Sequence, residues 1–155
     1  MENRIEILRK YIGNNIPSIE YTEERLGIYT HIYAVSQFCA MIAAKRKQNV
    51  ELSVIAGMLH DIYAFKTLDP KDHAEKGSII AKEILDMLKL TTDEETEIIC
   101  TAINKHSDKK NKHSDFTEVL VDADVLQHYL YNIFLPVSER EKDRLKKLLK
   151  EFGLE

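Results

Sequence analysis

The stretch IAGMLHDI at residues 55–62 is an apolar run that ends in a histidine beside an aspartate, His60 and Asp61. An imidazole and a carboxylate cost free energy to bury among apolar side chains unless both have partners. A divalent metal ion would satisfy both groups at once. In a helix, Gly57 stands three and four residues before this pair, on the same face, and its missing side chain leaves room there. The pair is either part of a metal site or the polar end of a core helix, and the dipeptide alone does not decide between the two.

The composition is that of one helix-rich domain. The chain has 155 residues, of which 44% are hydrophobic and 31% charged, with only five glycines and three prolines. This length is enough to bury one core, and so few turn-forming residues favour helices over a sheet. We predict an all-α fold, a bundle of six or seven helices that forms a single domain over residues 1–155.

Charge and cysteine content limit the partners and the compartment. The formal net charge is −4, which argues against binding along a nucleic acid backbone, because that needs a basic surface. Cys39 and Cys100 lie in apolar helical runs outside any C-x-x-C pair, as reduced core cysteines of a cytosolic protein do. No apolar run approaches membrane-spanning length. We expect a cytoplasmic protein that binds neither duplex nucleic acid nor a membrane.

Apolar residues at helical spacing predict where the helices lie. The expected helices are 3–12, 22–44, 50–63, one from about residue 70, one from Thr92 to about His106, one capped by Ser114, and a C-terminal amphipathic helix after Pro136.

Start signals support several of these helices. The sequence DPKD at 69–72 offers an Asp N-cap followed by Pro at the first helical position. TDEE at 92–95 and SERE at 138–141 match the capping box. Residues 14–17, 64–69 and 107–113 are predicted loops, and three lysines make the last one a solvated polar connection.

Three predicted core helices carry polar residues where apolar ones are expected. His31 stands four residues before Val35 and so points toward the core, the His60-Asp61 pair closes the next helix, and Asp124 lies in the apolar helix that follows Ser114. Two imidazoles with two carboxylates make a mixed nitrogen and oxygen ligand set suited to Mn²⁺, Fe²⁺, Co²⁺, Ni²⁺ or Zn²⁺. The absence of thiolates from this set argues against a structural zinc site.

The order of these residues resembles the HD-domain superfamily of metal-dependent phosphohydrolases. The resemblance covers about residues 25–130 and rests on His31, on LHDI at 59–62 and on DADVL at 122–126. It implies an HD-like core with peripheral N- and C-terminal helices. On the family pattern Asp124 is the metal ligand, and Asp122 is the less favoured rival, otherwise a surface acid of the helix.

Family members with two metals have further histidines between the doublet and the last aspartate, and His73 and His106 stand at comparable places. The resemblance then implies a bridging Asp61. The alternative is one metal, with His73 and His106 binding substrate phosphate, and the two alternatives stay open here. The remaining histidines lack such support. We predict that His113 is a loop residue, and that His128, four residues after Asp124, either packs, which we favour, or lies beside the site without being a ligand. The implied ligands are His31, His60, Asp61 and Asp124 for the first ion, and Asp61, His73 and His106 for the second.

Two branches of the family differ in how well they match. Ile62 is followed by Tyr63 and Ala64 instead of the Gly-Lys of the signalling branch, and no Gly-Tyr-Pro motif occurs, so a cyclic dinucleotide phosphodiesterase of that type is not implied. The small binuclear enzymes that cleave dinucleoside polyphosphates are closer in size and helix layout. Their usual threonine after the last histidine is Ser107 here.

The resemblance implies a phosphohydrolase, a phosphomonoesterase or phosphodiesterase in which a metal-activated water attacks phosphorus. Its expected substrate is a small phosphorylated molecule, nucleotide-like in kind. Asp61 would act at the reacting centre, and Lys66 and Lys105 would neutralise phosphate charge, with Lys76 and Lys109 as further candidates. The competing hypothesis is a regulatory HD module that holds a metal or nucleotide without turnover.

Overall fold

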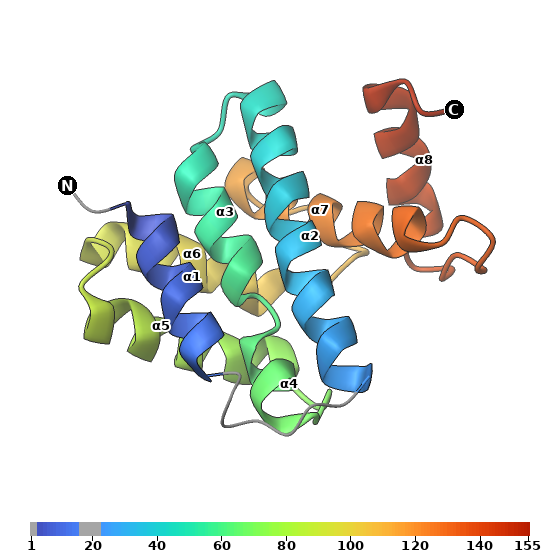
Figure 1. The fold of residues 1–155 in the computed structure, drawn as a ribbon. Helices are drawn as coiled ribbons and strands as arrows, with labels where there is room; N and C mark the ends of the chain where they lie inside the picture. The colour runs from blue at the N-terminus through green and yellow to red at the C-terminus, as the bar shows by residue number, and fades with distance from the viewer. Residues whose placement is uncertain (1–2, 16–22) are drawn as a thin grey trace.

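The computed structural model describes residues 3–15 and 23–155, and within this part of the chain the secondary structure consists of helices joined by turns and loops, without a strand. The all-α prediction is therefore confirmed. The helices, labelled in Figure 1, are α1 (Arg4–Asn15), α2 (Glu23–Arg46), α3 (Val50–Leu59), α4 (Ile62–Thr67), α5 (His73–Leu88), α6 (Asp93–Lys105), α7 (Asp115–Tyr131) and α8 (Lys142–Phe152).

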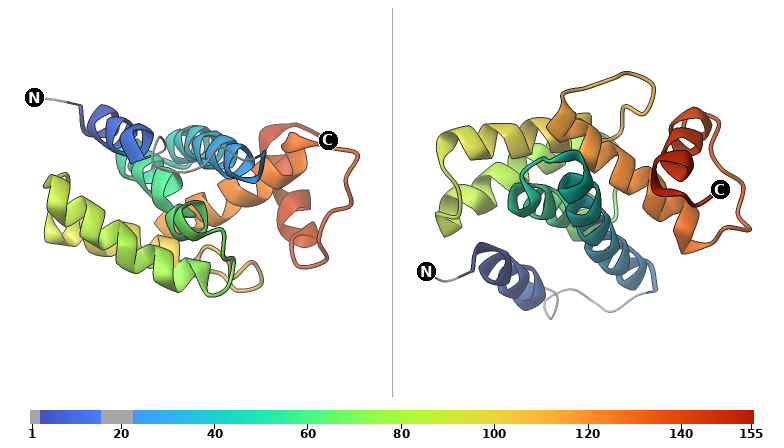
Figure 2. Two further views of the ribbon diagram at one scale, coloured as in Figure 1. Left: turned by 60° about the horizontal axis from the view of Figure 1, so that its bottom comes forward. Right: turned by 90° about the horizontal axis from the view of Figure 1, so that it is seen from above.

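Helices α2, α3 and α7 form the centre of the molecule, and α5 and α6 make a helical hairpin packed against it. Helix α1 lies against α3 and buries Leu8 and Ile12. Figure 2 shows α8 at one end of the molecule, beyond the end of α7 and away from the α5–α6 hairpin. One continuous core therefore joins α1 to α7, and its largest fully buried side chains are Phe65, Leu8, Ile12, Ile32, Ile42, Ile55, Met58, Leu59, Leu85, Ile99, Ile103 and Leu120.

Gly57 lets α2 and α3 approach closely. A Cβ atom at this position would lie 2.7 Å from Ser36 Cα and 3.1 Å from Cys39 Sγ, both on α2. The space left by the missing side chain is thus filled by the backbone of α2. The sequence pattern had indicated that this space stays free beside His60 and Asp61, and that expectation is wrong.

Two predicted helix starts are confirmed. Thr92 and Glu95 form the reciprocal capping box, in which Thr92 Oγ1 accepts from the Glu95 amide and the Glu95 carboxylate accepts from the Thr92 amide. Ser114 Oγ accepts from the Thr117 amide at the start of α7. These caps depend on local geometry alone, which is why sequence spacing identifies them.

Two other predicted starts are wrong, because the acids involved have different partners. Glu141 turns its carboxylate to His128 Nδ1 at 3.0 Å, so SERE at 138–141 forms a turn and α8 begins only at Lys142. The Asp69 carboxylate accepts from the Lys71 amide, and Asp72 adopts a left-handed conformation with φ of 54°, so α5 begins at His73.

The loop predicted over 64–69 is largely the short helix α4, the element that brings the number of helices to eight within the described residues. Its first turn closes where the Phe65 amide donates to Asp61 O, and Phe65 is buried in the core. Helix α1 likewise continues through Gly13 to Asn15, past its predicted end. Residues Pro17 and Thr22, the other predicted boundaries here, lie outside the described residues.

Helix α2 is long and apolar enough to cross a membrane by length and composition, contrary to the expectation that no run reaches such a length. Core helices of globular proteins meet the same criterion. Here Ile32, Val35, Cys39 and Ile42 of α2 are buried against neighbouring helices. The apolar character of α2 is therefore explained by its place in the core.

The close contact between α2 and α3 predicts a large effect of Gly57→Ala. Its new methyl group would overlap backbone atoms of Ser36, so the free energy of unfolding should fall by about 1–3 kcal/mol. Gly27→Ala is the matched control, because a Cβ there meets no atom within 4 Å. That variant should gain up to about 1 kcal/mol from the better helix propensity of alanine. Urea unfolding measures both, and equal effects would contradict the close contact.

Candidate metal centre

Six ligand-type side chains from separate helices and helix ends meet at one place in the core. They are His31 in α2, His60 at the C-terminal end of α3, Asp61 between α3 and α4, His73 at the start of α5, His106 at the C-terminal end of α6 and Asp124 in α7.

The first group is His31, His60, Asp61 and Asp124. The Nε2 atoms of His31 and His60 lie 3.1 Å apart, and Asp61 Oδ2 lies 3.5 Å from each of them. Asp124 Oδ1 lies 3.1 Å from His31 Nε2 and 3.8 Å from His60 Nε2. Two nitrogens and two carboxylate oxygens therefore face a common point.

The second group is His73, His106 and the other oxygen of Asp61. The two Nε2 atoms are again 3.1 Å apart, and Asp61 Oδ1 lies 3.6 Å from His73 Nε2 and 3.3 Å from His106 Nε2. Asp61 thus presents one oxygen to each histidine pair. This is the arrangement that a bridging carboxylate has between two cations.

The ring orientation of the histidines follows from their Nδ1 partners. His60 Nδ1 donates to Gly57 O at 2.7 Å, and His106 Nδ1 donates to Ile103 O at 2.6 Å, so each histidine satisfies a terminal carbonyl of its own helix. His73 Nδ1 donates to Pro70 O at 2.9 Å. His31 Nδ1 donates to Gln127 Oε1 at 2.6 Å.

With its proton on Nδ1, each of these imidazoles presents an unprotonated Nε2 to the cluster. Two such nitrogens 3.1 Å apart cannot hydrogen-bond to each other. The Ser107 hydroxyl donates to His73 Nε2 at 3.1 Å, which agrees with this tautomer. An Nδ1 donor that orients an Nε2 ligand is the usual arrangement of a metal-binding histidine.

Two carboxylate oxygens in the cluster also indicate that the cluster can bind a metal ion. Asp61 Oδ1 and Asp124 Oδ1 are buried and accept no hydrogen bond within the described residues. Leaving an ionised oxygen buried without a partner is expensive. A divalent cation between the oxygens and the Nε2 atoms would satisfy both, so the residues present fit a metal centre, and the mixed ligand set suits the transition metals named above.

The electrostatics keep His60, Asp61 and Asp124 in their metal-binding forms. At His31, burial opposes the charged form, but Asp124 and Asp61 outweigh it and raise the pKa. Burial lowers the pKa of His60 to about 4, so its imidazole is neutral near pH 7. Burial raises the pKa of Asp61, but His60 and His106 outweigh it and hold the pKa below its usual range. Burial likewise opposes ionisation of Asp124, yet Lys109 and His31 keep its pKa well below the ordinary value. Both carboxylates are therefore charged.

Among the lysines, only Lys109 is brought to the cluster by the described structure. Lys109 is buried, and its ammonium contacts Asp124 Oδ2, in place of the solvated loop position predicted for it. Lys66 and Lys105 are exposed at the last turns of α4 and α6, and in the described residues neither forms an ion pair with the cluster. Lys76 faces Asp69 and Asp72 at 3.9 Å. The predicted contacts of Lys66 and Lys105 with phosphate stay predictions.

Asp122 is neither a ligand nor a surface acid. It is buried and pairs with Arg46 and Arg144, each at 2.7 Å. Residues two apart on a helix point to different faces, so Asp122 and Asp124 cannot share one site.

His128 lies beside the site, which was the less favoured of the two sequence alternatives. Its Nε2 lies 3.4 Å from Asp124 Oδ1, its Nδ1 lies 3.0 Å from Glu141 Oε1, and its ring stacks on His31 at 5.3 Å. The four-residue spacing from Asp124 was the signal for this contact. His113 is a loop residue, as predicted, and bonds to Asp108 O. Gln127, which orients His31, was missed because an amide in a helix gives no signal of its own.

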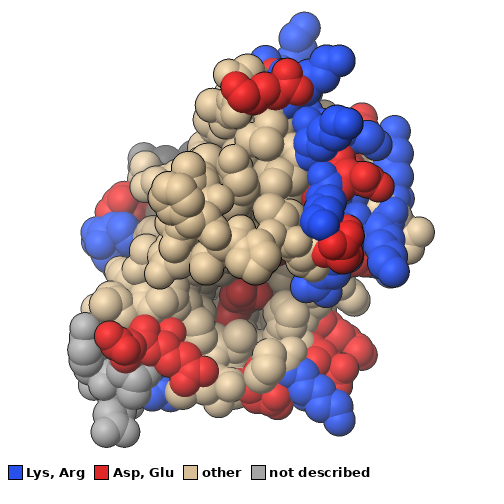
Figure 3. Space-filling view, turned by 90° about the vertical axis from the view of Figure 1, so that its right-hand side faces the viewer, with Lys and Arg blue, Asp and Glu red and all other residues tan. Residues whose placement is uncertain are grey.

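Figure 3 shows the face at the α8 end of the molecule, with Lys and Arg gathered along one side. Near the middle of the face, acidic atoms lie recessed among neutral side chains. Asp61 is partly exposed, with 19% of its side chain accessible, whereas His60 is fully buried. The cluster is therefore closed at His60 and partly open to solvent at Asp61 and at His73, whose side chain is 28% accessible.

This fold and cluster define an all-α protein with a group of histidines and aspartates between its helices that could hold metal ions. The model of the HD domain family matches residues 28–150, and the chain belongs to that family, whose members bind divalent metal ions and act as hydrolases. The prediction of an HD domain is confirmed.

A solved structure shares the fold. It is described as a predicted HD superfamily hydrolase from an uncultured Thermotogales bacterium, with 20% sequence identity and a TM-score of 0.56. The match covers 99% of this chain and 89% of the other. No curated protein matches the chain. At this identity the likeness supports the architecture and not a shared substrate.

The burial of His60 predicts acid sensitivity of the metal-free protein. The pKa of His60 is about 4 in the folded state against 6.5 when unfolded, so the unfolded state takes up the proton first. Stability should fall as the pH drops from about 6.5, by about 3 kcal/mol at pH 4 from this group.

The raised pKa of His31 has the opposite effect on stability. The contribution of His31 to the free energy of unfolding is complete below pH 6.5 and is lost as the pH rises through the pKa of His31 in the folded state.

Urea unfolding at several pH values, in the presence of a chelator, measures this dependence. The loss between pH 6.5 and 4 should shrink in His60→Gln and persist in the control His113→Gln. Equal slopes in wild type and His60→Gln would contradict the linkage.

Proposed function

We propose that this protein is a metal-dependent phosphohydrolase that cleaves a phosphate ester of a small, nucleotide-like molecule. The observation that carries the proposal is the position of Asp61, whose two oxygens face two separate histidine pairs. A carboxylate so placed is suited to two adjacent cations. Two-metal centres of this kind serve in-line displacement at phosphorus in other enzymes.

Each ligand has a stated task in this proposal. His31, His60 and Asp124 would complete the first ion position, and His73 with His106 would form the second. When bound, the ions lower the pKa of a water molecule and neutralise charge on a phosphoryl oxygen. The protein holds the ligands with fixed Nδ1 donors, keeps both carboxylates ionised and leaves Asp61 and His73 partly accessible to solvent and substrate.

A hollow beside the centre supports the nucleotide-like character of the substrate. It has a volume of about 330 Å³, and its lining includes Gln127, His128, Tyr129, Tyr131 and Leu135. Two of these residues also contact the ligand His31. Apolar and aromatic walls with a few polar groups suit a ring such as a nucleobase.

Metal stoichiometry tests the centre. Wild-type protein should bind about two Mn²⁺ per chain, and His73→Ala/His106→Ala should lose one of the two equivalents. Asp61→Ala removes the shared ligand and should lose most of both. His113→Ala should match the wild type. A single wild-type equivalent that survives in the double variant would favour one metal, with His73 and His106 as phosphate ligands.

Activity is a separate measurement. Nucleotides and simple phosphate esters should be hydrolysed with Mn²⁺, Fe²⁺, Co²⁺ or Ni²⁺, and His60→Ala should reduce kcat/KM by at least a hundredfold. Tight metal binding without hydrolysis of any ester would favour the regulatory module instead.

A further inference from the structure

Lys109 is a buried lysine that lies outside the helices. It lies in the connection between α6 and α7, with a side chain only 1% accessible and its ammonium on Asp124 Oδ2. A buried ammonium is stable only where its partner and its backbone are held in place. Because Asp124 Oδ1 faces His31, the ammonium occupies the oxygen that is turned away from the candidate ligands.

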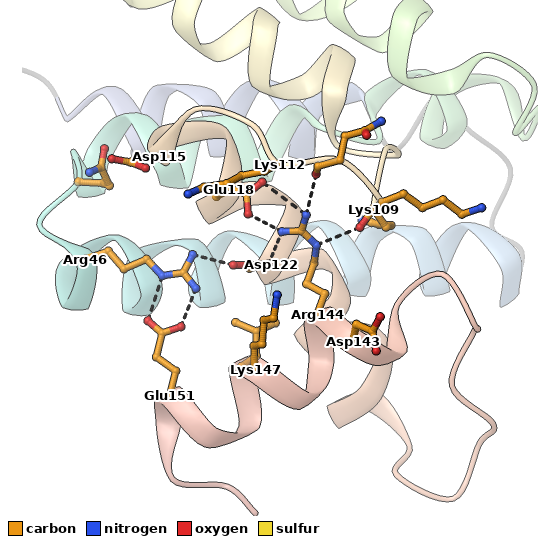
Figure 4. A pocket seen from close by; sticks show the side chains of 14 residues that line it. Arg46, Lys109, Lys112, Asp115, Glu118, Asp122, Asp143, Arg144, Lys147 and Glu151 are labelled. Atoms are coloured by element: carbon orange, nitrogen blue, oxygen red, sulfur yellow. Dashed lines mark hydrogen bonds and ion pairs between the residues drawn. The ribbon is translucent and has the colours of Figure 1, made fainter.

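Arg144 of α8 holds the backbone that carries this lysine. Its Nε donates to Lys109 O at 3.3 Å and its Nη2 to Asn111 O at 3.0 Å, while Nη1 pairs with Glu118 at 2.6 Å and Asp122 at 2.7 Å on α7. Figure 4 shows the guanidinium between α7 and the connection, with these bonds drawn from it. One planar group therefore fixes the connection to the helix that bears Asp124.

Arg46 and Arg144 line a common pocket, and both are already paired with carboxylates. The ion pairs of these two arginines join α8 to α2 and α7. Asp122 anchors the arginines on one face of α7, and Asp124 points into the metal centre from another face. The chain of contacts runs from α8 through Arg144, the Lys109 backbone and the Lys109 ammonium to a metal ligand.

We propose that Arg144 is a positioning residue of the metal centre, and that α8 thereby sets metal affinity. The proposal rests on the metal centre proposed above. By holding the 107–113 connection, Arg144 keeps the Lys109 ammonium on Asp124 Oδ2 and leaves Asp124 Oδ1 directed at His31. Groups that orient ligands in this way change metal affinity by about 10- to 100-fold when removed.

Arg46 provides a matched comparison. It pairs with the same Asp122 at 2.7 Å and with Glu151 of α8 at 2.7 Å, so it also joins α8 to the core. Neither partner belongs to the 107–113 connection. Any effect of α8 anchoring in general should therefore appear in both arginine variants, whereas an effect through Lys109 should appear in one.

The experiment titrates Mn²⁺ into wild type, Arg144→Lys and Arg46→Lys, and follows free Mn²⁺ by electron paramagnetic resonance. Lysine keeps the charge and removes the planar fork. Circular dichroism and the midpoint of thermal unfolding report whether each variant folds and how much stability it loses. We expect both variants to lose similar stability, while the Kd for Mn²⁺ rises about tenfold in Arg144→Lys and stays within twofold in Arg46→Lys.

A double-mutant cycle tests the route through Lys109. Lys109→Met should raise the Kd at least as much as Arg144→Lys, without touching the ion pairs of Arg144. Adding Arg144→Lys to Lys109→Met should then change the Kd no further.

Three results would overturn the proposal: an unchanged Kd in Arg144→Lys, an equal rise in Arg46→Lys, or additive effects in the double variant. Wild-type protein that binds no Mn²⁺ would be a different result, because it would remove the metal centre itself.

Discussion

The structure depends on one constraint, the burial of unprotonated nitrogen and carboxylate lone pairs that face one another between helices. The N–H groups of His60 and His106 are directed at carbonyls of their own helices, so their Nε2 atoms can only accept. The same bonds place each imidazole against a carbonyl in the last turn of its own helix. The hydrogen bonds at the ends of α3 and α6 therefore also orient the two candidate ligands. The cluster becomes favourable in the core when a cation neutralises it, which couples folding to metal binding.

Helix α7 separates two kinds of buried charge by the geometry of the helix itself. Asp124 faces the histidines, whereas Asp122, two residues earlier, faces Arg46 and Arg144. The ion pairs of Asp122 with the arginines help to hold α8 against the domain, whereas Asp124 belongs to the candidate metal centre. Lys109 connects the two, because its backbone bonds to Arg144 and its ammonium to Asp124. A C-terminal helix that looks peripheral in the ribbon thus contacts the surroundings of the centre, and Glu141 extends this contact to His128.

Helix boundaries show where local sequence suffices. The TDEE cap at 92–95 was predicted correctly because both of its hydrogen bonds lie within four residues. The same pattern at 138–141 failed because Glu141 has a stronger partner, His128, thirteen residues away. Lys109 shows the same limit. Polar composition predicted a solvated loop, and the long-range bond to Arg144 and the contact with Asp124 placed the lysine in the interior instead.

The sequence by itself determined the all-α class and the ligand-type residues, because helical periodicity and a histidine or aspartate among apolar neighbours are local signals. The resemblance to the HD family, and not the spacing, indicated that Asp124 instead of Asp122 belongs with the histidines. Only the tertiary structure decided which oxygen of Asp61 faces which histidine pair, that Gly57 admits the backbone of α2, and that Gln127, His128 and Lys109 adjoin the ligands. Apart from the contact of His128 with Asp124, four residues away on the same helix, those contacts join residues far apart in the chain, and their geometry exists only once the helices have packed.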